Sequence, residues 1–145
     1  IPVIDFPASW DERAEEFGYE TIEELYDYFV NILVNQTMIN ELRSEFPSTT
    51  IFTIPTGWST LKLAQMYEEN LLQDTISFFG PKPTSLFTDQ KGHQGQIAIE
   101  TGTLVWLQSI YNVDLLTNTY ETGFNTELHD IAKDVTDNHD PNYKQ

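Results

Sequence analysis

The residues of this sequence that are best suited to chemistry are an aspartate and a histidine in one short loop. Asp89 and His93 are four positions apart, and Gly92 and Gly95 surround the histidine. A carboxylate beside an imidazole holds the ring in one tautomer and stabilises the imidazolium that forms when the ring takes a proton from a nucleophile. The spacing therefore predicts that Asp89 orients His93 as a general base, with a carboxylate oxygen within about 3.2 Å of a ring nitrogen.

A second interpretation of the same loop involves no catalysis. A glycine-rich turn whose histidine caps the following helix produces the same pattern of residues. The position of the loop favours a functional role, because it follows a predicted strand at Ser85–Thr88. In open α/β sheets, ligands bind outside the carboxyl ends of the strands. Residue type and position therefore agree, while the structural interpretation of the turn remains open.

Ser59 is the candidate nucleophile within the chain. It follows a predicted strand at Ile51–Ile54 and a turn that contains a glycine, and it lies at the start of a predicted helix. This order resembles the strand–turn–helix elbow of Gly-x-Ser-x-Gly enzymes. The second glycine of that pattern is replaced by Leu61, although close packing at such a sharp turn needs a glycine. The alternative role of Ser59 is that of a hydroxyl in the first helical turn or at the N-cap.

The turn before Ser59 is predicted to bind substrate. It consists of Thr56, Gly57 and Trp58, and it follows the carboxyl end of one predicted strand, as the His93 loop follows another. Parallel strands have their carboxyl ends at the same edge of a sheet, where ligands bind. We therefore expect the two loops to line one pocket.

The elements that position these loops alternate between strand and helix. Capping patterns and apolar residues at helical spacing predict helices over residues 10–17, 22–46, 58–73, 97–111 and 126–135. Strands separated by helices predict crossover connections and an α/β fold of three layers, with a mainly parallel sheet flanked by helices. The strands at Ile51–Ile54 and Ser85–Thr88 are expected to be adjacent and parallel. With Ile1–Phe6 the pattern gives only three strands, so the sheet is incomplete or is shared across a homo-oligomer interface.

Length and charge restrict the class of protein and its partners. A chain of 145 residues fits a single domain, residues 1–145, in which we expect residues 137–145 to form a frayed tail. Twenty-three acidic and seven basic residues give a net charge of −16, which repels phosphate backbones and anionic membranes. We therefore expect no nucleic-acid partner. The acidic residues form either a solvated surface or a surface for a cationic partner.

Several other sites are not indicated by the sequence. There is no cysteine, which removes disulfides and thiolate ligands and leaves the compartment undetermined, with a secreted or periplasmic location slightly favoured. No run of about 18 apolar residues is present, so no membrane span is expected. The histidines and carboxylates do not follow a zinc or calcium pattern, and no cofactor-binding glycine motif occurs. We therefore expect no metal and no cofactor.

Two sequence blocks are similar to a known family. The Asp89–His93 loop is followed by Gly95 and by a helix that contains the run 104–108, Leu-Val-Trp-Leu-Gln, and upstream the run 50–58 reads Thr-Ile-Phe-Thr-Ile-Pro-Thr-Gly-Trp. Both blocks resemble the C-terminal part of the SGNH (GDSL-type) hydrolases. The resemblance implies hydrolysis of a small-molecule ester, an acyl ester of a carbohydrate or lipid, with His93 as general base and Asp89 as its orienting partner.

The sequence also departs from this family. The family spacing is Asp-x-x-His, whereas three residues separate Asp89 from His93. The Gly-Asp-Ser block that carries the nucleophile, and the Gly and Asn blocks that supply oxyanion donors, do not occur in these residues. The resemblance therefore implies the C-terminal portion of such a domain, or a degenerate member, with its nucleophile outside this chain. The alternative is a non-catalytic acidic α/β module that binds a ligand or assembles.

Overall fold

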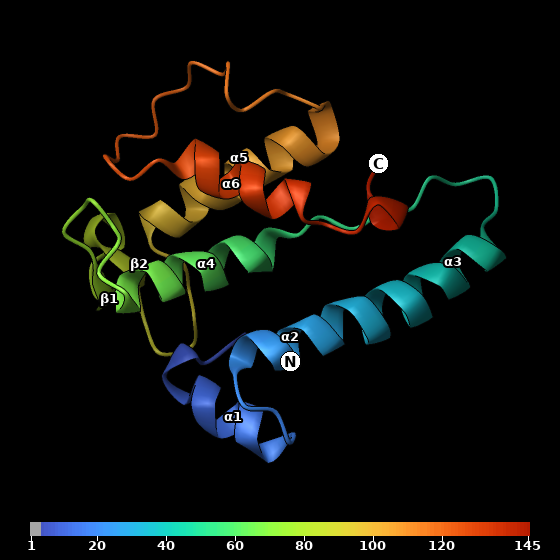
Figure 1. Cartoon of the computed structure of the whole chain (residues 1–145), viewed down its shortest axis with the longest axis horizontal. Coiled ribbons are helices and arrows are strands. Elements are labelled where there is room, and N and C mark those ends of the chain that lie inside the picture. Colours follow the sequence, from blue (N-terminus) through green and yellow to red (C-terminus); the bar gives the residue numbers. More distant parts are fainter. Residues whose placement is uncertain (1–3) are drawn as a thin grey trace. The chain divides into compact units, whose positions relative to one another are not determined.

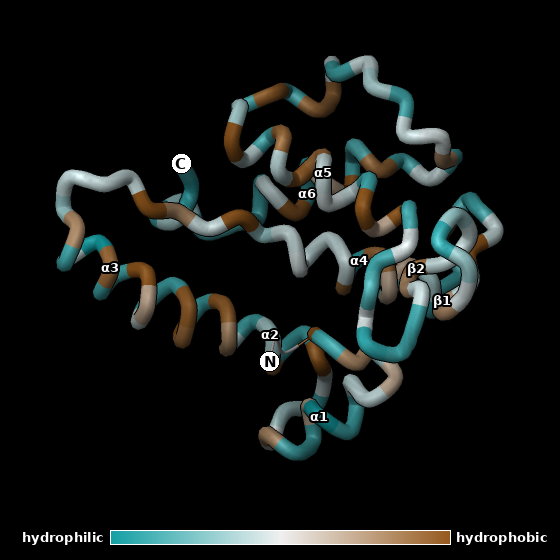
Figure 2. The backbone as a smooth tube through the Cα atoms, turned by 180° about the vertical axis from the view of Figure 1, so that it is seen from behind, coloured by the Kyte–Doolittle hydropathy of each residue, from teal (hydrophilic) through white to brown (hydrophobic). Residues whose placement is uncertain are grey.

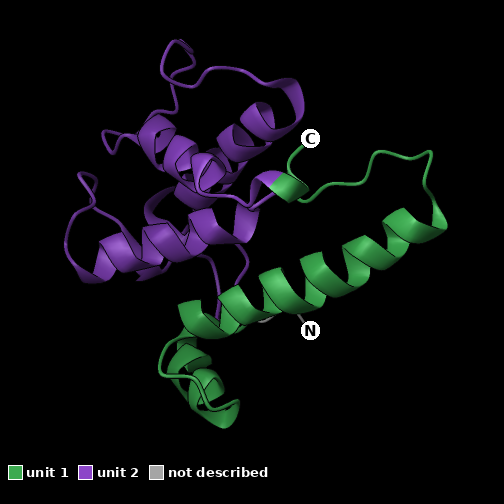
Figure 3. Cartoon of the chain, turned by 45° about the vertical axis from the view of Figure 1, so that its right-hand side comes forward, with its two compact units in different colours: residues 1–53, 142–145 green, residues 54–141 purple. Residues whose placement is uncertain are grey.

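The computed structural model of the protein describes residues 4–145, which form two compact units. Unit 1 consists of the chain up to Thr53 together with Asn142–Gln145, and unit 2 consists of Ile54–Pro141 (Figure 3). Among the described residues, no helix is long and apolar enough to cross a membrane. The assignment of the whole chain to one SGNH-like domain stays a prediction.

Unit 1 is built on one long helix. Helix α1 (Trp10–Glu16) precedes a continuous helical stretch that comprises α2 (Ile22–Tyr28), the π-helical segment Phe29–Ile39 and α3 (Asn40–Glu45) (Figure 1). The stretch begins at a cap in which the Thr21 hydroxyl accepts the Glu24 N–H at 3.2 Å. The predicted helices over residues 10–17 and 22–46 are therefore confirmed within one residue.

The end of the chain contacts α3, although its composition predicted a frayed tail. Helix α6 (Leu128–Asp137) belongs to unit 2, and in unit 1 Tyr143 is buried. The Arg43 guanidinium lies over the Tyr143 ring, 5.1 Å from its centroid, and donates to the Asn142 carbonyl at 2.9 Å. The polar composition of the tail had indicated fraying, but a cation–π contact and hydrogen bonds from a distant helix order it.

The predicted strand at Ile51–Ile54 is also wrong. The segment carries no strand pairing. Its polar backbone groups are satisfied otherwise: Arg43 donates to the Ile51 carbonyl from Nε at 2.9 Å and Nη2 at 2.6 Å, and the Thr53 N–H donates to the Tyr143 carbonyl at 3.0 Å. A β-branched run favours extended backbone, but a side chain and the chain end take the place of a neighbouring strand.

Unit 2 has three helices around a common core. They are α4 (Thr56–Glu68), α5 (Gln96–Tyr111) and α6 (Leu128–Asp137), and each contacts the other two. Helix α5 lies against both others, and apolar residues recur along it (Figure 2). The fully buried side chains include Leu61, Leu63, Leu86, Phe87, Ile97, Leu104, Val105, Leu115 and Leu128.

The sheet of unit 2 has two short parallel strands. β1 (Ser77–Phe79) pairs with β2 (Ser85–Phe87), with Ser77 opposite Ser85 and Phe79 opposite Phe87. The predicted pairing of β2 with Ile51–Ile54 is therefore wrong. Parallel strands normally need a connection of about a dozen residues or more. Here residues 80–84 suffice, because the buried Ser85 hydroxyl donates to the carbonyls of Gly80 at 3.0 Å and Pro81 at 2.9 Å.

The described chain is thus a mainly helical protein with a small parallel sheet. This architecture is broadly compatible with the α/β class, but the predicted three layers are not present in residues 4–145. The predicted strand Ile1–Phe6 lies partly outside the described residues. Its remainder, Ile4–Phe6, forms a turn in which Phe6 has a φ of 58°.

Candidate functional site

The loop after β2 is a tight hairpin. Two hydrogen bonds close it, from the Thr88 N–H to the His93 carbonyl and from the Gly95 N–H to the Leu86 carbonyl, both 2.7 Å long. At its tip the Gly92 N–H donates to the Asp89 carbonyl at 3.2 Å, and Gly92 has a φ of 96°, a conformation that glycine adopts without strain. The two strands of the hairpin therefore hold residues 89 and 93 beside each other.

The predicted Asp89–His93 pair is present. Asp89 Oδ2 lies 2.5 Å from His93 Nδ1, and the two side chains are 45% and 71% exposed, respectively. The extra residue relative to Asp-x-x-His is accommodated by the turn, so it does not carry the carboxylate away from the ring. The expectation of contact and partial exposure is confirmed, while the catalytic roles of the two residues stay predictions.

The electrostatics of the pair favour an ionised carboxylate. The hydrogen bond from His93 is the largest influence on Asp89 and lowers its pKa. Desolvation acts to raise this pKa, and the Lys91 N–H, which donates to Asp89 Oδ1 at 2.9 Å, lowers it further. A carboxylate that accepts a hydrogen bond from Nδ1–H favours the tautomer in which the proton is on Nδ1. The other ring nitrogen, Nε2, then carries a lone pair. The pair can therefore take up a proton at Nε2 from a hydroxyl group brought to the hairpin.

Gly95 is essential to this hairpin for reasons of space. A Cβ atom at residue 95 would lie 1.8 Å from the Ser85 carbonyl oxygen. Its φ of −73° is open to any residue, so the requirement comes from the close approach of two backbones. The sequence marked Gly95 only as one of the glycines beside His93, and its packing role was missed.

The hairpin lies against the first part of α4. Gln94 Nε2 donates to Thr60 Oγ1 at 2.8 Å, which joins the two elements. The predicted substrate-binding residues Thr56, Gly57 and Trp58 form the first turn of α4 and not a loop before it. Thr56 Oγ1 accepts a hydrogen bond from Trp106 Nε1 of α5 at 2.7 Å. The structure thus places this turn and the hairpin on neighbouring elements of unit 2, and the common pocket of the two stays a prediction.

Ser59 has the environment of a structural hydroxyl. Its exposed fraction is 0%, and its Oγ donates to the Thr56 carbonyl at 2.7 Å within the first turns of α4. This arrangement matches the alternative role given to Ser59 above. A hydroxyl that is buried and already donating cannot attack a solvent-borne ester in this conformation. Its role as a nucleophile stays an untested prediction, which the geometry does not favour.

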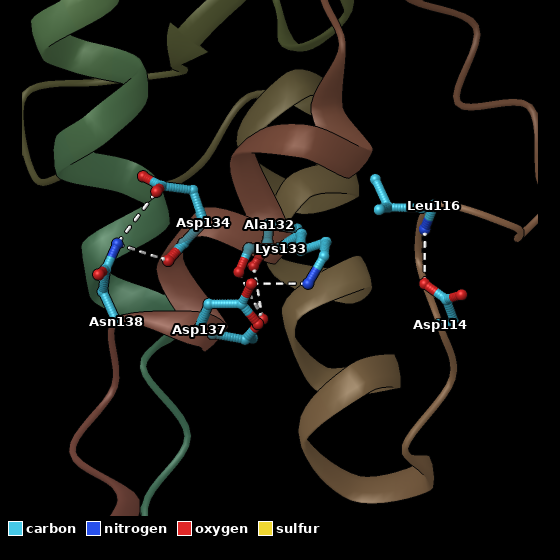
Figure 4. Close-up of polar contacts among 8 residues, drawn as sticks. Asp114, Leu116, Ala132, Lys133, Asp134, Asp137 and Asn138 are labelled. Carbon is cyan, nitrogen blue, oxygen red and sulfur yellow. Dashed lines mark hydrogen bonds and ion pairs between the residues drawn. The ribbon is translucent and has the colours of Figure 1, made fainter.

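Asp134 and Asp137 of α6 form hydrogen bonds and an ion pair with residues close by in the sequence (Figure 4). Lys133 Nζ lies 2.6 Å from Asp137 Oδ2, and this contact raises the pKa of Lys133. Asn138 Nδ2 donates to the carbonyl and the Oδ1 of Asp134, both at 3.0 Å. Within residues 4–145, no group of three or more histidine or acidic side chains is placed to hold a metal ion.

Asp74 is an important residue that the sequence analysis missed. Its carboxylate accepts four hydrogen bonds from two residues, at 3.0 Å from N and Nδ2 of Asn125 and at 2.8 and 2.7 Å from N and Oγ1 of Thr126. Desolvation acts to raise the pKa of Asp74, but the four hydrogen bonds together lower it. No local pattern could reveal this contact, because the partners are 51 and 52 positions away.

Comparison of the chain with protein-family models, with curated proteins and with solved structures finds no match.

Proposed function

We propose that the Asp89–His93 hairpin supplies the acid–base half of an ester-hydrolysing site of the SGNH type. The observation that supports this proposal is the 2.5 Å contact between Asp89 and Nδ1 of an imidazole that is 71% exposed. A histidine so held is oriented and yet accessible to a substrate. The substrate class is an acyl ester of a carbohydrate or lipid, and in this proposal β1 and β2 belong to a larger three-layer sheet.

The chemistry assigns one proton route to the pair. His93 Nε2 takes the proton of a serine hydroxyl as its oxygen attacks the ester carbonyl, and Asp89 stabilises the imidazolium. The imidazolium then gives this proton to the leaving alkoxide, and an acyl-enzyme remains. Water hydrolyses the acyl-enzyme by the same route. The serine comes from outside the 145 residues, since Ser59 is buried and these residues contain no Gly-Asp-Ser block.

A non-catalytic acidic module is the second candidate function. It is favoured by the hydrogen bond from the Lys91 N–H to Asp89 Oδ1, because this bond gives Asp89 a role in the turn that requires no reaction. In that case His93 only completes the turn. Removal of the imidazole abolishes activity under the first candidate function and has no catalytic effect under the second, so one experiment separates them.

The test uses the complete natural reading frame that contains these residues. The proposal expects it to encode a strand followed by Gly-Asp-Ser and to hydrolyse p-nitrophenyl acetate. His93→Gln and Asp89→Asn should each lower kcat by about 10³–10⁴, because the members of such a site act as a unit. His129→Gln is the matched control, because the imidazole of His129 hydrogen-bonds the amide oxygen of Asn118 at 3.3 Å. A frame without that block, or equal activity of all variants, would establish the non-catalytic module.

A further inference from the structure

The long helix of unit 1 carries apolar side chains that remain exposed to solvent. Four of them, which we call the helix surface, are between 38% and 48% exposed: Tyr28, Ile32, Leu33 and Met38. Apolar side chains exposed singly are common, but a set along one helix indicates an interaction site. Apolar positions recur along this helix in Figure 2, where brown and teal alternate.

Packing within unit 1 explains why these side chains are uncovered. The middle of the helix is covered at Asn35 and Ile39, which are buried. The Asn35 side chain accepts from Thr53 Oγ1 at 3.1 Å, so the segment after the helix lies on that side. In the π-helical segment successive turns are about five residues apart, so Tyr28, Leu33 and Met38 follow one another along the helix on a different side. The described residues of unit 1 leave that side exposed.

The charge around the helix surface is negative. Asp27, Glu41 and Glu45 are exposed or half-buried on the same helix. The only basic residue of the stretch 22–45 is Arg43, and its guanidinium is engaged by the Ile51 and Asn142 carbonyls and by the Tyr143 ring. No free cation of this described helix therefore compensates the acidic groups near its two ends.

We propose that the helix surface docks a basic amphipathic helix of another protein. Such a partner buries its apolar face on Ile32 and Leu33 and brings Lys or Arg side chains to Asp27 and Glu41. The choice of partner is based on charge. A second copy of this chain carries the same net charge of −16 and is repelled, as is an anionic membrane.

The experiment uses a synthetic 14-residue peptide of Leu and Lys with leucines at helical spacing, titrated with the 145-residue chain by fluorescence anisotropy. A scrambled peptide of the same composition and a Leu–Glu analogue are the controls. We expect the scrambled peptide to bind at least about tenfold more weakly, and the Leu–Glu analogue not to bind. Affinity of the Leu–Lys peptide should fall as salt rises. Equal binding of the Leu–Lys and scrambled peptides would overturn the proposal.

Variants locate the site. Ile32→Ser with Leu33→Ser should weaken binding at least about tenfold. The matched control is Leu71→Ser with Leu116→Ser, two exposed apolar residues of unit 2, which should leave binding unchanged. If the first pair unfolds unit 1, Asp27→Asn with Glu41→Gln should still weaken binding severalfold and reduce its salt dependence. Unchanged binding in these variants, or a dimer in light scattering that Ile32→Ser with Leu33→Ser dissociates, would overturn the proposal.

Discussion

Two aspartates of unit 2 have lowered pKa values for different structural reasons. Asp74 accepts four hydrogen bonds from Asn125 and Thr126, so both of its oxygens are occupied by groups that do not titrate near neutral pH. Asp89 has one oxygen on a backbone N–H and the other on His93, whose ring is exposed. The first arrangement joins two loops. The second leaves a proton-accepting nitrogen open to solvent, and only such an arrangement can take part in acid–base chemistry.

We expect a substitution at Gly95, the base of the hairpin, to destabilise unit 2 more than a substitution at Asp89 or His93. Gly95→Ala should destabilise unit 2 by about 3 kcal/mol, because the new methyl carbon would lie 1.8 Å from the Ser85 carbonyl oxygen and the backbone must move. Urea unfolding measures this. Gly80→Ala is the control, since its Cβ would lie 3.5 Å from the nearest atom, an ordinary contact. Similar loss in both variants would show that the close approach is not the cause.

Asp74→Asn should be the next largest change. The new amide can place its NH₂ group against two hydrogen-bond donors of Thr126. The free energy of unfolding should fall by about 1–2 kcal/mol, and not by more, because the side chain is partly exposed. Asp89→Asn is the matched variant and should cost less, since its side chain is 45% exposed. The free energies of unfolding of the two variants check the order. The reverse order would show that the hairpin, and not the Asp74 contact, holds unit 2 together.

The pH dependence is set by the direction of the two shifts. The pKa of both carboxyl groups is lower in the folded chain than the ordinary value of 3.8. Their contribution to stability is therefore fully present above this value and is lost as the pH falls through the lower folded pKa. Urea unfolding should show that the free energy of unfolding is smaller at pH 3 than at pH 6. Of the variants, Asp74→Asn should reduce this difference most. An unchanged loss in that variant would assign the acid sensitivity to other carboxylates.

Sequence reasoning succeeded where the deciding contacts are local. The helix Gln96–Tyr111 was predicted within one residue, because apolar spacing is set within the helix itself. The Asp89–His93 contact was predicted for the same reason, since one turn fixes its geometry.

Sequence reasoning failed where distant residues decide the structure. The Ile51–Ile54 run has the composition of a strand, but its backbone binds Arg43 and Tyr143, the latter about 90 positions away. β1 was hidden because Gly80 and Pro81 directly after Phe79 indicate a loop, whereas the short return is held by hydrogen bonds from the Ser85 hydroxyl and the Gly80 N–H. Tyr143 and Asn142 have the composition of a polar tail, but the distant residues Arg43 and Thr53 hold them.

Two double-mutant cycles measure the coupling energy between each aspartate and its hydrogen-bond partner, and this is the smallest effect that we predict. The cycle of Asp74→Asn with Thr126→Val should give a coupling energy of about 1 kcal/mol that changes little with salt, because it removes the Oγ1 hydrogen bond of a partly buried pair. The cycle of Asp89→Asn with His93→Gln should give a smaller coupling that disappears at about 1 M salt, since the exposed pair is screened. Urea unfolding in low and high salt measures both. A salt-resistant coupling at Asp89 and His93 would mean that the pair stabilises the fold as Asp74 does, which would favour the structural interpretation of the hairpin over the catalytic one.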